Sequence, residues 1–420
     1  MSDAPRHTGT RILIVAENAS TRLGGEAILP HHYFRLLRQR GLDAHLIVHA
    51  RTRDELLQSF PEEHARLHFV EDQALQKLFY KTGRILPRRI DEATLGLANQ
   101  MLTQRAQVRI LRTLVTSKCV VHQPIPVSPK FPSLLHNVGA PVIIGPLNGG
   151  MEFPPAFRTT EGTVSRIAIA AGRSVSNLVN AFCPGKRKAA VVLVANSRTR
   201  DALPSGLEGR IVELPENAVD TTQWTLAPIT DAQPSQRFVF IGRLVDWKAL
   251  DLVLEALPQV PEATLDVVGD GPMLPTWRAL AESLGLGARV HFNGWRTQAE
   301  CAALLAGCCA LVLPSIYECG GAVVLEAMAM ARPVIATAWG GPTDYLDETC
   351  GILIEPTSRA ALVQGFVTAM SRLAESPAHA AQLGAAGRER LLRDFDWNRK
   401  IDTMIDLYGS TLTHRTARSD

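Results

Sequence analysis

The stretch that decides the fold is CALVLPSIYECGGAVVLEAMAMARPVIA, residues 309–336. It begins with a short apolar run, 309–313, which is typical of a strand buried on both faces of a parallel sheet. A loop with two adjacent glycines follows, and from about Ala322 the pattern AVVLEAMAMA predicts a helix. A second apolar run, 333–336, predicts the next strand. Strand, loop, helix and strand in this order are the repeating unit of a doubly wound α/β sheet.

The same unit recurs on both sides of this stretch. Further strands of the second half are expected at 237–241, 264–268, 289–292 and 351–354. In the first half, strands are expected at 11–16, 43–49, 119–122, 141–144 and 191–195, and the span 54–115 is expected to be mainly helical. The sequence therefore predicts two α/β domains, 1–215 and 237–395, joined by a linker at 216–236 and followed by a C-terminal helix, 396–420, that crosses back to the first domain.

Composition limits the class of protein. With 420 residues, 46% hydrophobic and 20% charged, the chain is expected to be globular and soluble, in two or three domains. No apolar run approaches the roughly 18 residues of a membrane-spanning helix, and the N-terminal MSDAPRHTGTR is not a secretory signal. The seven cysteines form no C-x-x-C pair, which favours reduced thiols in a cytoplasmic protein.

Charge is distributed unevenly along the chain. Residues 1–200 carry 27 basic and 14 acidic side chains, a balance of +13, whereas residues 201–420 carry 17 basic and 27 acidic ones, a balance of −10. A basic half often meets an anionic partner such as a membrane or a phosphorylated substrate. Two basic clusters carry this hypothesis, Lys77–Arg89 and Lys186–Lys188. The alternative is that the two halves attract each other across a cleft.

Two glutamates flank the glycine loop of the opening stretch. Glu318 lies in the expected loop between strand and helix, and Glu326 lies in the first turns of the helix. Gly320 and Gly321 leave backbone N–H groups open at a helix N-terminus, where an anion is favoured. A carboxylate beside such a loop can accept hydrogen bonds from sugar hydroxyls. The alternative is that Glu326 only stabilises the start of the helix and that Glu318 is solvated.

Two cations follow the first strand of the second domain. Arg243 and Lys248 come just after 237–241, at the carboxyl end where ligands bind in such sheets. A forked guanidinium and a compact ammonium together suit a diphosphate, although two surface cations are the alternative. By contrast, Gly269-Asp270-Gly271 lacks the third glycine of a dinucleotide fingerprint.

With these residues in place, the second half resembles the retaining glycosyltransferases of family 4, which have the two-domain GT-B architecture. The resemblance is carried by a set of short motifs spread over nearly the whole second half: Gly242-Arg243-Leu244 with Lys248, 268–272 (VGDGP), 292–295 (FNGW), 313–315 (LPS), the Glu318/Glu326 pair, 332–336 (RPVIA), 340–342 (GGP) and 395–397 (FDW). The first half matches more loosely, through Gly24-Gly25, His122, Asn196-Ser197 and 215–220 (PENAVD). The implied fold is α/β, with two Rossmann-like doubly wound parallel sheets facing a central cleft.

The resemblance also implies roles for single residues. Arg243 and Lys248 would neutralise the donor diphosphate, Glu326 would hold the ribose hydroxyls, and Glu318 would bind a hydroxyl of the donor sugar. Backbone N–H groups of Gly320, Gly321, Ala322 and Val323 would contact sugar and phosphate, and Gly24 and Gly25 would let a loop of the first domain approach the diphosphate. His122, at the end of a first-domain strand, matches the histidine that lies near the sugar, and with Glu318 it is the implied catalytic residue.

Some positions depart from the family or have a plain structural alternative. His122 ends the apolar run CVVH, and the alternative is a histidine packed under the loop that follows. Cys319 and Gly320 stand where family members often carry Pro or Ser and then Phe, which bears on the identity of the donor sugar. Asp394-Phe395-Asp396 spells D-x-D, but its place before the terminal helix predicts a helix cap rather than a metal site.

The expected function is the transfer of a sugar from a UDP- or GDP-linked donor to an acceptor hydroxyl, with retention and without a metal or other cofactor. The expected partners are the nucleotide sugar, a lipid-linked or glycan acceptor and an anionic membrane surface, with no nucleic acid. The expected location is the cytoplasm, with possible peripheral binding to the cytoplasmic face of a membrane. Two alternatives stay open: a sugar-phosphate isomerase or phosphorylase of the same fold, and a non-catalytic nucleotide-sugar-binding protein.

Overall fold

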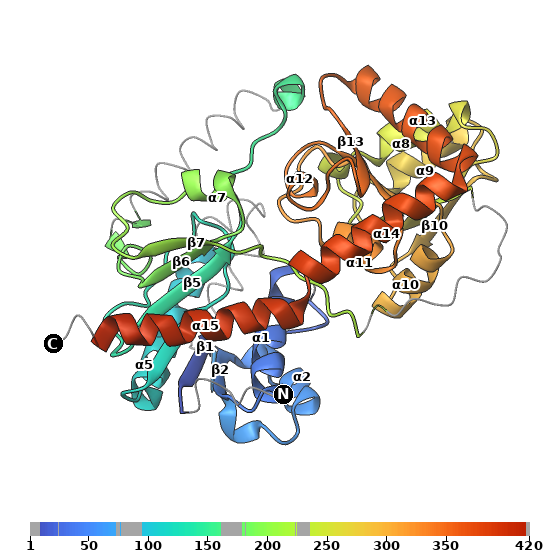
Figure 1. Cartoon of the computed structure of the whole chain (residues 1–420). Coiled ribbons are helices and arrows are strands. Elements are labelled where there is room, and N and C mark those ends of the chain that lie inside the picture. Colours follow the sequence, from blue (N-terminus) through green and yellow to red (C-terminus); the bar gives the residue numbers. More distant parts are fainter. Residues whose placement is uncertain are drawn as a thin grey trace. The chain divides into compact units, whose positions relative to one another are not determined.

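The computed structural model of the chain describes residues 9–23, 25–72, 76, 95–160, 179–180, 182–222, 224 and 236–416. The described residues form two compact units, and each is a parallel sheet with helices packed on it (Figure 1). Unit 1 takes its residues from Met1–Gly150, Thr163–Glu216 and Lys400–Asp420. Unit 2 takes its residues from Met151–Gly162 and Asn217–Arg399. The chain therefore passes from one unit to the other more than once.

Unit 1 is built on a seven-stranded sheet in the order β3-β2-β1-β4-β5-β6-β7, and its paired strands are parallel. The strands are β1 (Arg11–Val15), β2 (Asp43–His49), β3 (Leu67–Val70), β4 (Cys119–Gln123), β5 (Val142–Leu147), β6 (Val191–Val194) and β7 (Arg210–Glu213). The order reverses between β1 and β4, so ligands of unit 1 are expected beyond the carboxyl ends of these two strands.

The two edge strands of this sheet, β3 and β7, are absent from the sequence prediction. Residues 67–70 of the span 54–115 form β3, whereas the other described elements of that span are helical, as predicted. Both edge strands have only four residues, LHFV and RIVE, and polar side chains interrupt their apolar pattern. An edge strand is covered less completely than a central one, so it lacks the continuous apolar run that identifies a buried strand.

The helices of unit 1 cover this sheet, whose core includes Leu13, Val15, Ile47 and Val121, all at 0% exposure. They are α1 (Ile28–Gln39), α2 (Arg53–Ser59), α5 (Leu97–Leu114) and α7 (Ser197–Asp201), with 3-10 turns η1 (Gly25–Ala27), η2 (Ala50–Thr52) and η3 (His64–Arg66). The terminal helix α15 (Trp397–Thr416), red in Figure 1, joins this unit from Lys400 onward. At its start, the Asp396 carboxylate accepts N–H bonds from Asn398 and Arg399, which confirms the predicted cap.

Unit 2 is built on a six-stranded sheet in the order β10-β9-β8-β11-β12-β13, again with parallel pairs. The strands are β8 (Arg237–Ile241), β9 (Thr264–Val268), β10 (Val290–Gly294), β11 (Ala310–Leu313), β12 (Val334–Thr337) and β13 (Gly351–Ile354). Each of the six confirms a predicted strand to within two residues at either end. Here the order reverses between β8 and β11.

Alternate side chains along the unit 2 strands enter two separate cores. Phe238 and Phe240 of β8 pack in one cluster, and Val239, which lies between them, packs in the other. Successive side chains of a strand point to opposite faces, so both faces of this sheet are covered. The covering helices are α8 (Leu250–Ala256), α9 (Leu274–Ser283), α10 (Gln298–Ala306), α11 (Ala322–Ala329), α12 (Pro342–Tyr345), α13 (Arg359–Glu375) and α14 (Pro377–Asp394), with 3-10 turns η5 (Pro155–Thr160), η6 (Asp246–Lys248) and η7 (Leu257–Gln259).

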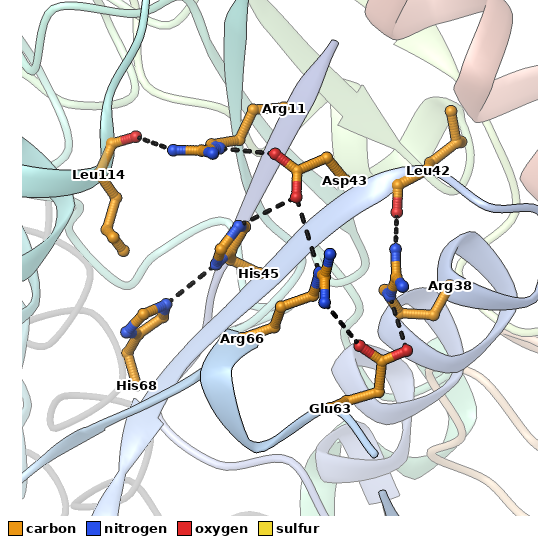
Figure 2. A network of polar contacts seen from close by, with 9 residues as sticks. All are labelled: Arg11, Arg38, Leu42, Asp43, His45, Glu63, Arg66, His68 and Leu114. Carbon is orange, nitrogen blue, oxygen red and sulfur yellow. Dashed lines mark hydrogen bonds and ion pairs between the residues drawn. The ribbon is translucent and has the colours of Figure 1, made fainter. Parts of the chain in front are cut away.

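A polar network ties the amino-terminal ends of β1, β2 and β3 together (Figure 2). Arg11 Nε donates to Asp43 Oδ2 at 2.7 Å, and these residues are partners in the β1–β2 register. Asp43 Oδ1 lies 3.2 Å from His45 Nε2, and His45 Nδ1 lies 3.0 Å from His68 Nε2 of β3. The two imidazoles stack at 5.3 Å between centroids. One ring nitrogen of the pair must be unprotonated to accept the shared hydrogen bond.

This pair predicts a loss of stability in mild acid. Burial is the main cause that lowers the pKa of both His45 and His68 below the value of 6.5 for an ordinary histidine. As the pH falls below 6.5, the unfolded chain binds protons that the folded state resists, so the free energy of unfolding decreases. We expect His68→Gln to flatten the fall of the melting temperature between pH 7 and pH 5, as measured by thermal denaturation. His64→Gln, at an exposed position, should leave that slope unchanged, and an unaltered slope in His68→Gln would contradict the assignment.

Candidate functional site

Lys248 and Glu318 meet at the point where the strand order of unit 2 reverses. Lys248 ends η6, which follows β8, and Glu318 lies in the loop after the neighbouring strand β11. Lys248 Nζ forms a hydrogen-bonded ion pair with Glu318 Oε2. Both side chains are largely buried, with 14% and 13% of their surfaces exposed. The sequence predicted a ligand role for each residue separately, and the fold brings them into contact.

This pair keeps capacity to bind a ligand. An ammonium has three N–H donors and a carboxylate has about four acceptor positions, so one shared bond leaves most of both unused. Arg243, the other predicted phosphate ligand, has an exposed side chain with no bonded partner among the described residues. The cations predicted for a diphosphate therefore lie on the chain beyond the carboxyl end of β8, one held by Glu318 and one exposed to solvent.

The loop after β12 packs against the backbone of the loop that carries Glu318. Gly341 N–H donates to the Glu318 carbonyl at 2.6 Å. A Cβ atom on Gly340, which has φ +74°, would lie 2.2 Å from the same carbonyl oxygen, so a larger residue does not fit there. The predicted Gly340-Gly341-Pro342 motif thus has a structural purpose, because it lets the backbone approach Glu318 closely.

The N-terminus of α11 carries a run of open donors. Gly321 adopts φ +73° and caps the helix, and Val324 N–H bonds back to the Gly321 carbonyl. The N–H groups of residues 320–323 have no hydrogen-bond partner within the part of the chain that the structure describes. Unpaired N–H groups at a helix start bind anions through their aligned dipoles. The resemblance assigned the N–H groups of Gly320, Gly321, Ala322 and Val323 to contacts with sugar and phosphate. The structure shows them unpaired among the described residues, and that role stays a prediction.

Glu326 lies within α11, a little more than one turn beyond this N-terminus. Burial raises its pKa to about 7, against 4.5 for an ordinary glutamate. No hydrogen bond or ion pair of its side chain is found among the described residues. The pKa of the nearby Cys301 thiol is raised mainly by burial and, to a smaller extent, by the charge of Glu326. A desolvated carboxyl without a donor is costly unless a ligand supplies hydrogen bonds. A vicinal diol such as that of ribose offers two.

In unit 1, the loop after β1 is held by two carboxylates. Glu55 of α2 accepts hydrogen bonds from the Ser20 hydroxyl at 2.6 Å and from Thr21 N–H at 2.7 Å. Glu26 accepts Val127 N–H at 2.8 Å, which joins this loop to the one after β4. Gly25 lies in this loop with φ +56°, and Gly24 lies outside the described residues. The roles of both glycines stay predictions.

His122 of β4 is fully buried, with both ring nitrogens in hydrogen bonds. Its Nε2 lies 2.7 Å from the Gly145 carbonyl, and its Nδ1 lies 2.8 Å from the Tyr408 hydroxyl of α15. The Tyr33 ring packs edge-on against it at 4.7 Å. One neutral tautomer, with Nε2–H donating and Nδ1 accepting, satisfies both bonds, and burial lowers the pKa of His122 to about 4. These contacts match the packed histidine that the sequence left open, and a catalytic role for His122 stays a prediction.

The structure does not describe a basic surface made by the two clusters, Lys77–Arg89 and Lys186–Lys188. Lys77–Arg89 lies outside the described residues. Lys186 is 3% exposed, and its Nζ donates to the carbonyls of Ser128 and Pro129 at 3.2 and 2.6 Å. Burial lowers its pKa to about 7. The prediction that Lys186 faces an anionic membrane is therefore wrong, because this side chain anchors a loop inside unit 1. In the same cluster, Arg187 is half-buried and Lys188 is exposed.

One segment near the site was missed by the sequence prediction. Residues 151–158 belong to unit 2, although the sequence placed them within a first domain of 1–215. The Phe153 ring lies 4.9 Å from the ring of Tyr317, the residue before Glu318. The segment MEFPPAFR has neither helical nor alternating periodicity, so no local pattern shows where it packs.

Comparison with known proteins finds relatives of the second half of the chain. Residues 235–375 match the family described as glycosyl transferases group 1. A GDP-mannose-dependent alpha-(1-6)-phosphatidylinositol monomannoside mannosyltransferase of Mycolicibacterium smegmatis is 30% identical over 241 residues, which cover 53% of this chain and 62% of that protein. A D-inositol 3-phosphate glycosyltransferase of Salinispora tropica is 33% identical over 196 residues, 43% of this chain and 40% of that protein. The matched region spans about half the length of these curated relatives.

The fold as a whole also has solved counterparts. The crystal structure of Anabaena HepE in complex with UDP and glucose superposes with a TM-score of 0.64 at 18% identity, over 96% of this chain and all of that one. A likeness at this identity establishes architecture. It confirms the predicted fold class, the two Rossmann-like units of the GT-B architecture. Within the described residues, no helix combines the length and apolarity needed to cross a bilayer.

Proposed function

We propose that the protein transfers a sugar from a nucleotide-diphosphate donor to an acceptor hydroxyl, because residues 235–375 match the family described as glycosyl transferases group 1. The observation that carries the proposal is the arrangement around α11. Two neighbouring strands of one sheet, β8 and β11, lead into the segments that carry these groups. They are the Lys248–Glu318 pair, the open N–H groups of residues 320–323 and the unpartnered Glu326. A cation, an anion-binding helix start and two carboxyls match a diphosphate, a sugar and a ribose.

Each group has a distinct task in the proposed reaction. Lys248, Arg243 and the start of α11 would stabilise the charge that develops on the departing diphosphate, a contribution that preorganised donors make in a dry site. Glu318 would hold a hydroxyl of the donor sugar, and Glu326 the ribose diol. The bond from the anomeric carbon to the phosphate oxygen breaks, and a bond to the acceptor oxygen forms. The acceptor proton passes to the departing diphosphate or to solvent.

Membership of family 4 and retention of the anomeric configuration are part of the proposal and rest on the resemblance of the motifs. In that case the acceptor attacks on the same face that the diphosphate leaves. We also propose that no metal is required, because Lys248, Arg243 and the helix start provide the positive potential that a divalent cation supplies in other transferases.

The deciding experiment is a panel of donors and acceptors with the purified full chain, read by mass spectrometry in the presence of a chelator. The expected result is an acceptor product heavier by one sugar, with release of UDP or GDP. An altered or phosphorolysed sugar without an acceptor product would favour an isomerase or phosphorylase. Tight donor binding without turnover over the whole panel would favour a binding protein, and strict dependence on added metal would contradict the metal-free proposal.

Glu326 predicts a pH dependence of donor binding. With a pKa raised to about 7 by burial, the free carboxyl is largely neutral at pH 6 and ionised at pH 8. A carboxylate is the stronger acceptor for ribose hydroxyls, so the Kd for UDP or GDP should fall as the pH rises from 6 to 8. Calorimetric titration across this range measures it. Glu326→Gln should bind weakly at every pH, and a pH profile that persists in Glu326→Gln would assign the titration to another group.

For the acceptor we propose a lipid-linked or glycan hydroxyl at an anionic membrane surface. The support is the +13 balance of residues 1–200, the Lys77–Arg89 cluster, and the acceptor in the printed name of the Mycolicibacterium smegmatis relative. Each Lys or Arg near an anionic leaflet contributes about 1 kcal/mol. We expect the chain to sediment with vesicles containing phosphatidylserine at low salt and to dissociate at high salt. The absence of sedimentation at low salt would favour a soluble acceptor.

A further inference from the structure

Residues 151–158, which we name the strap, are encoded in the first half of the chain but belong to unit 2. The chain leaves unit 1 at Gly150, whose φ of +73° and close approach to the Arg198 carbonyl exclude a side chain. The strap begins at Met151 and ends in the 3-10 turn η5. Its position in unit 2 brings a piece of the first sequence half next to the Glu318 loop.

The far end of the strap is anchored in an apolar cluster. Phe157 is 9% exposed and packs with Ala249, Leu252 and Leu362. Ile316, two residues before Glu318, packs against the same cluster. The strap and the Glu318 loop therefore share one core. Within the strap, Arg158 pairs with Glu152 and donates to the Phe153 carbonyl, which closes the segment on itself.

The near end of the strap contacts the loops that carry and support Glu318. The Phe153 and Tyr317 rings lie 4.9 Å apart at an interplanar angle of 36°. Trp339 Nε1 donates to the Glu152 carbonyl at 2.7 Å. Met151 Sδ and the Glu318 carbonyl fill the space that a side chain at position 340 would occupy. Three successive strap residues thus meet the two loops that hold Glu318.

We propose that the strap forms part of the donor-sugar site, and that Phe153 is a positioning residue that fixes Glu318 through Tyr317. Glu318 is directly bonded to Lys248 on one side and supported by Gly341 on the other, but its neighbour Tyr317 is held by the strap. A carboxylate that must recognise one sugar hydroxyl needs its backbone fixed to within a fraction of an ångström. The effect of the strap on sugar recognition rests on the proposed function, whereas its effect on the Glu318 loop does not.

The first test needs no activity. Hydrogen–deuterium exchange of the full chain compares wild type with Phe153→Ala. The backbone amides of residues 317–321 should exchange faster in the variant, and those of β9 should not change. Phe182→Ala, which removes an exposed phenylalanine of unit 1, is the matched control and should leave residues 317–321 unaffected. Unchanged exchange at residues 317–321 in Phe153→Ala would overturn the proposal, whether or not the protein transfers sugar.

The second test separates the effect of Phe153 on binding of the sugar from its effect on binding of the nucleotide. Kd values for UDP, GDP, UDP-glucose and GDP-mannose are measured by calorimetry. Phe153→Ala should weaken binding of the preferred nucleotide sugar by roughly 3- to 10-fold, the size expected for loss of one aromatic pair, and should weaken binding of the matching nucleoside diphosphate clearly less. Phe153→Tyr should restore the wild-type value, since it keeps the ring.

A double-mutant cycle shows whether Phe153 acts through Glu318. If it does, Phe153→Ala should have little further effect in a Glu318→Gln background, because the group that it positions is already gone. The positioning role would be overturned if Phe153→Ala weakened binding of the nucleotide sugar equally in wild type and in Glu318→Gln. It would also be overturned if Phe153→Ala weakened binding of the nucleotide and of the nucleotide sugar equally. A wild-type chain that binds none of the four probes would count against the proposed function, and the exchange experiment would still decide the place of the strap.

Discussion

Replacement of Lys248 by alanine is expected to lower kcat/KM for the donor by about 10²–10³-fold, the usual cost of removing one preorganised group that stabilises transition-state charge. The variant loses the cation proposed for the diphosphate. It also leaves Glu318, 13% exposed, without its ion-pair partner. Steady-state kinetics with a saturating acceptor measures the effect. Lys118→Ala, which removes an exposed lysine of unit 1 outside both basic clusters, is the matched control and should behave as wild type.

Variants of the Lys248–Glu318 ion pair can separate an effect on protein stability from an effect on the rate of sugar transfer. Removing one partner of a largely buried ion pair is more costly than removing both, because the remaining charge is left unpaired. We therefore expect Lys248→Met with Glu318→Gln to be more stable than Lys248→Met alone, while turnover stays low in both. If Lys248→Ala keeps the donor affinity and the rate of wild type, Lys248 is not part of the donor site.

Replacement of His122 by alanine is expected to reduce the free energy of unfolding of unit 1 by several kcal/mol. The variant leaves the Gly145 carbonyl and the Tyr408 hydroxyl without their partner, and an unsatisfied buried group costs about 1–3 kcal/mol. Tyr408→Phe, which keeps the ring and removes one bond, should cost about 1 kcal/mol. Chemical denaturation measures both, and the double variant should lose less than the sum, since the two residues share a bond.

This experiment also decides between two roles for His122. If the histidine packs α15 onto unit 1, the stability loss should dominate, and His122→Gln that remains folded should keep its turnover. If it contacts the donor sugar, as the family resemblance implies, His122→Gln should fold and lose turnover, whereas Tyr408→Phe should keep it. The burial of the ring and its two satisfied nitrogens favour the first outcome.

The sequence predicted all six strands of unit 2 and the central strands of unit 1, and it missed the two edge strands of unit 1. A strand covered on both faces must be apolar throughout, as in ILIV of β1 or ALVL of β11, and such runs are visible in the chain. The edge strands β3 and β7 are short and partly polar, so they look like loop or helix. Their pairing comes from neighbouring strands that are distant in sequence.

The candidate site was predictable where chemistry follows directly from position along the chain. Glu318 and Glu326 come just after a buried strand and at the start of a helix, so the opening stretch alone places them at the ligand-binding edge. Residue type did not tell which side chains face a ligand. Lys186 looked like a surface cation and is buried against two carbonyls, and His122 looked like a cleft residue and is enclosed by Tyr33 and Tyr408.

By itself, the sequence determined the class of the fold and the edge of the sheet at which the second-half motifs gather, because strand periodicity and the order of strand, loop and helix are local properties. Only the tertiary structure decided which groups touch. Lys248 and Glu318 are 70 residues apart, Phe153 and Tyr317 are 164 apart, and His122 and Tyr408 are 286 apart. Such contacts depend on how strands are ordered and where the chain crosses between units, and no local pattern encodes either.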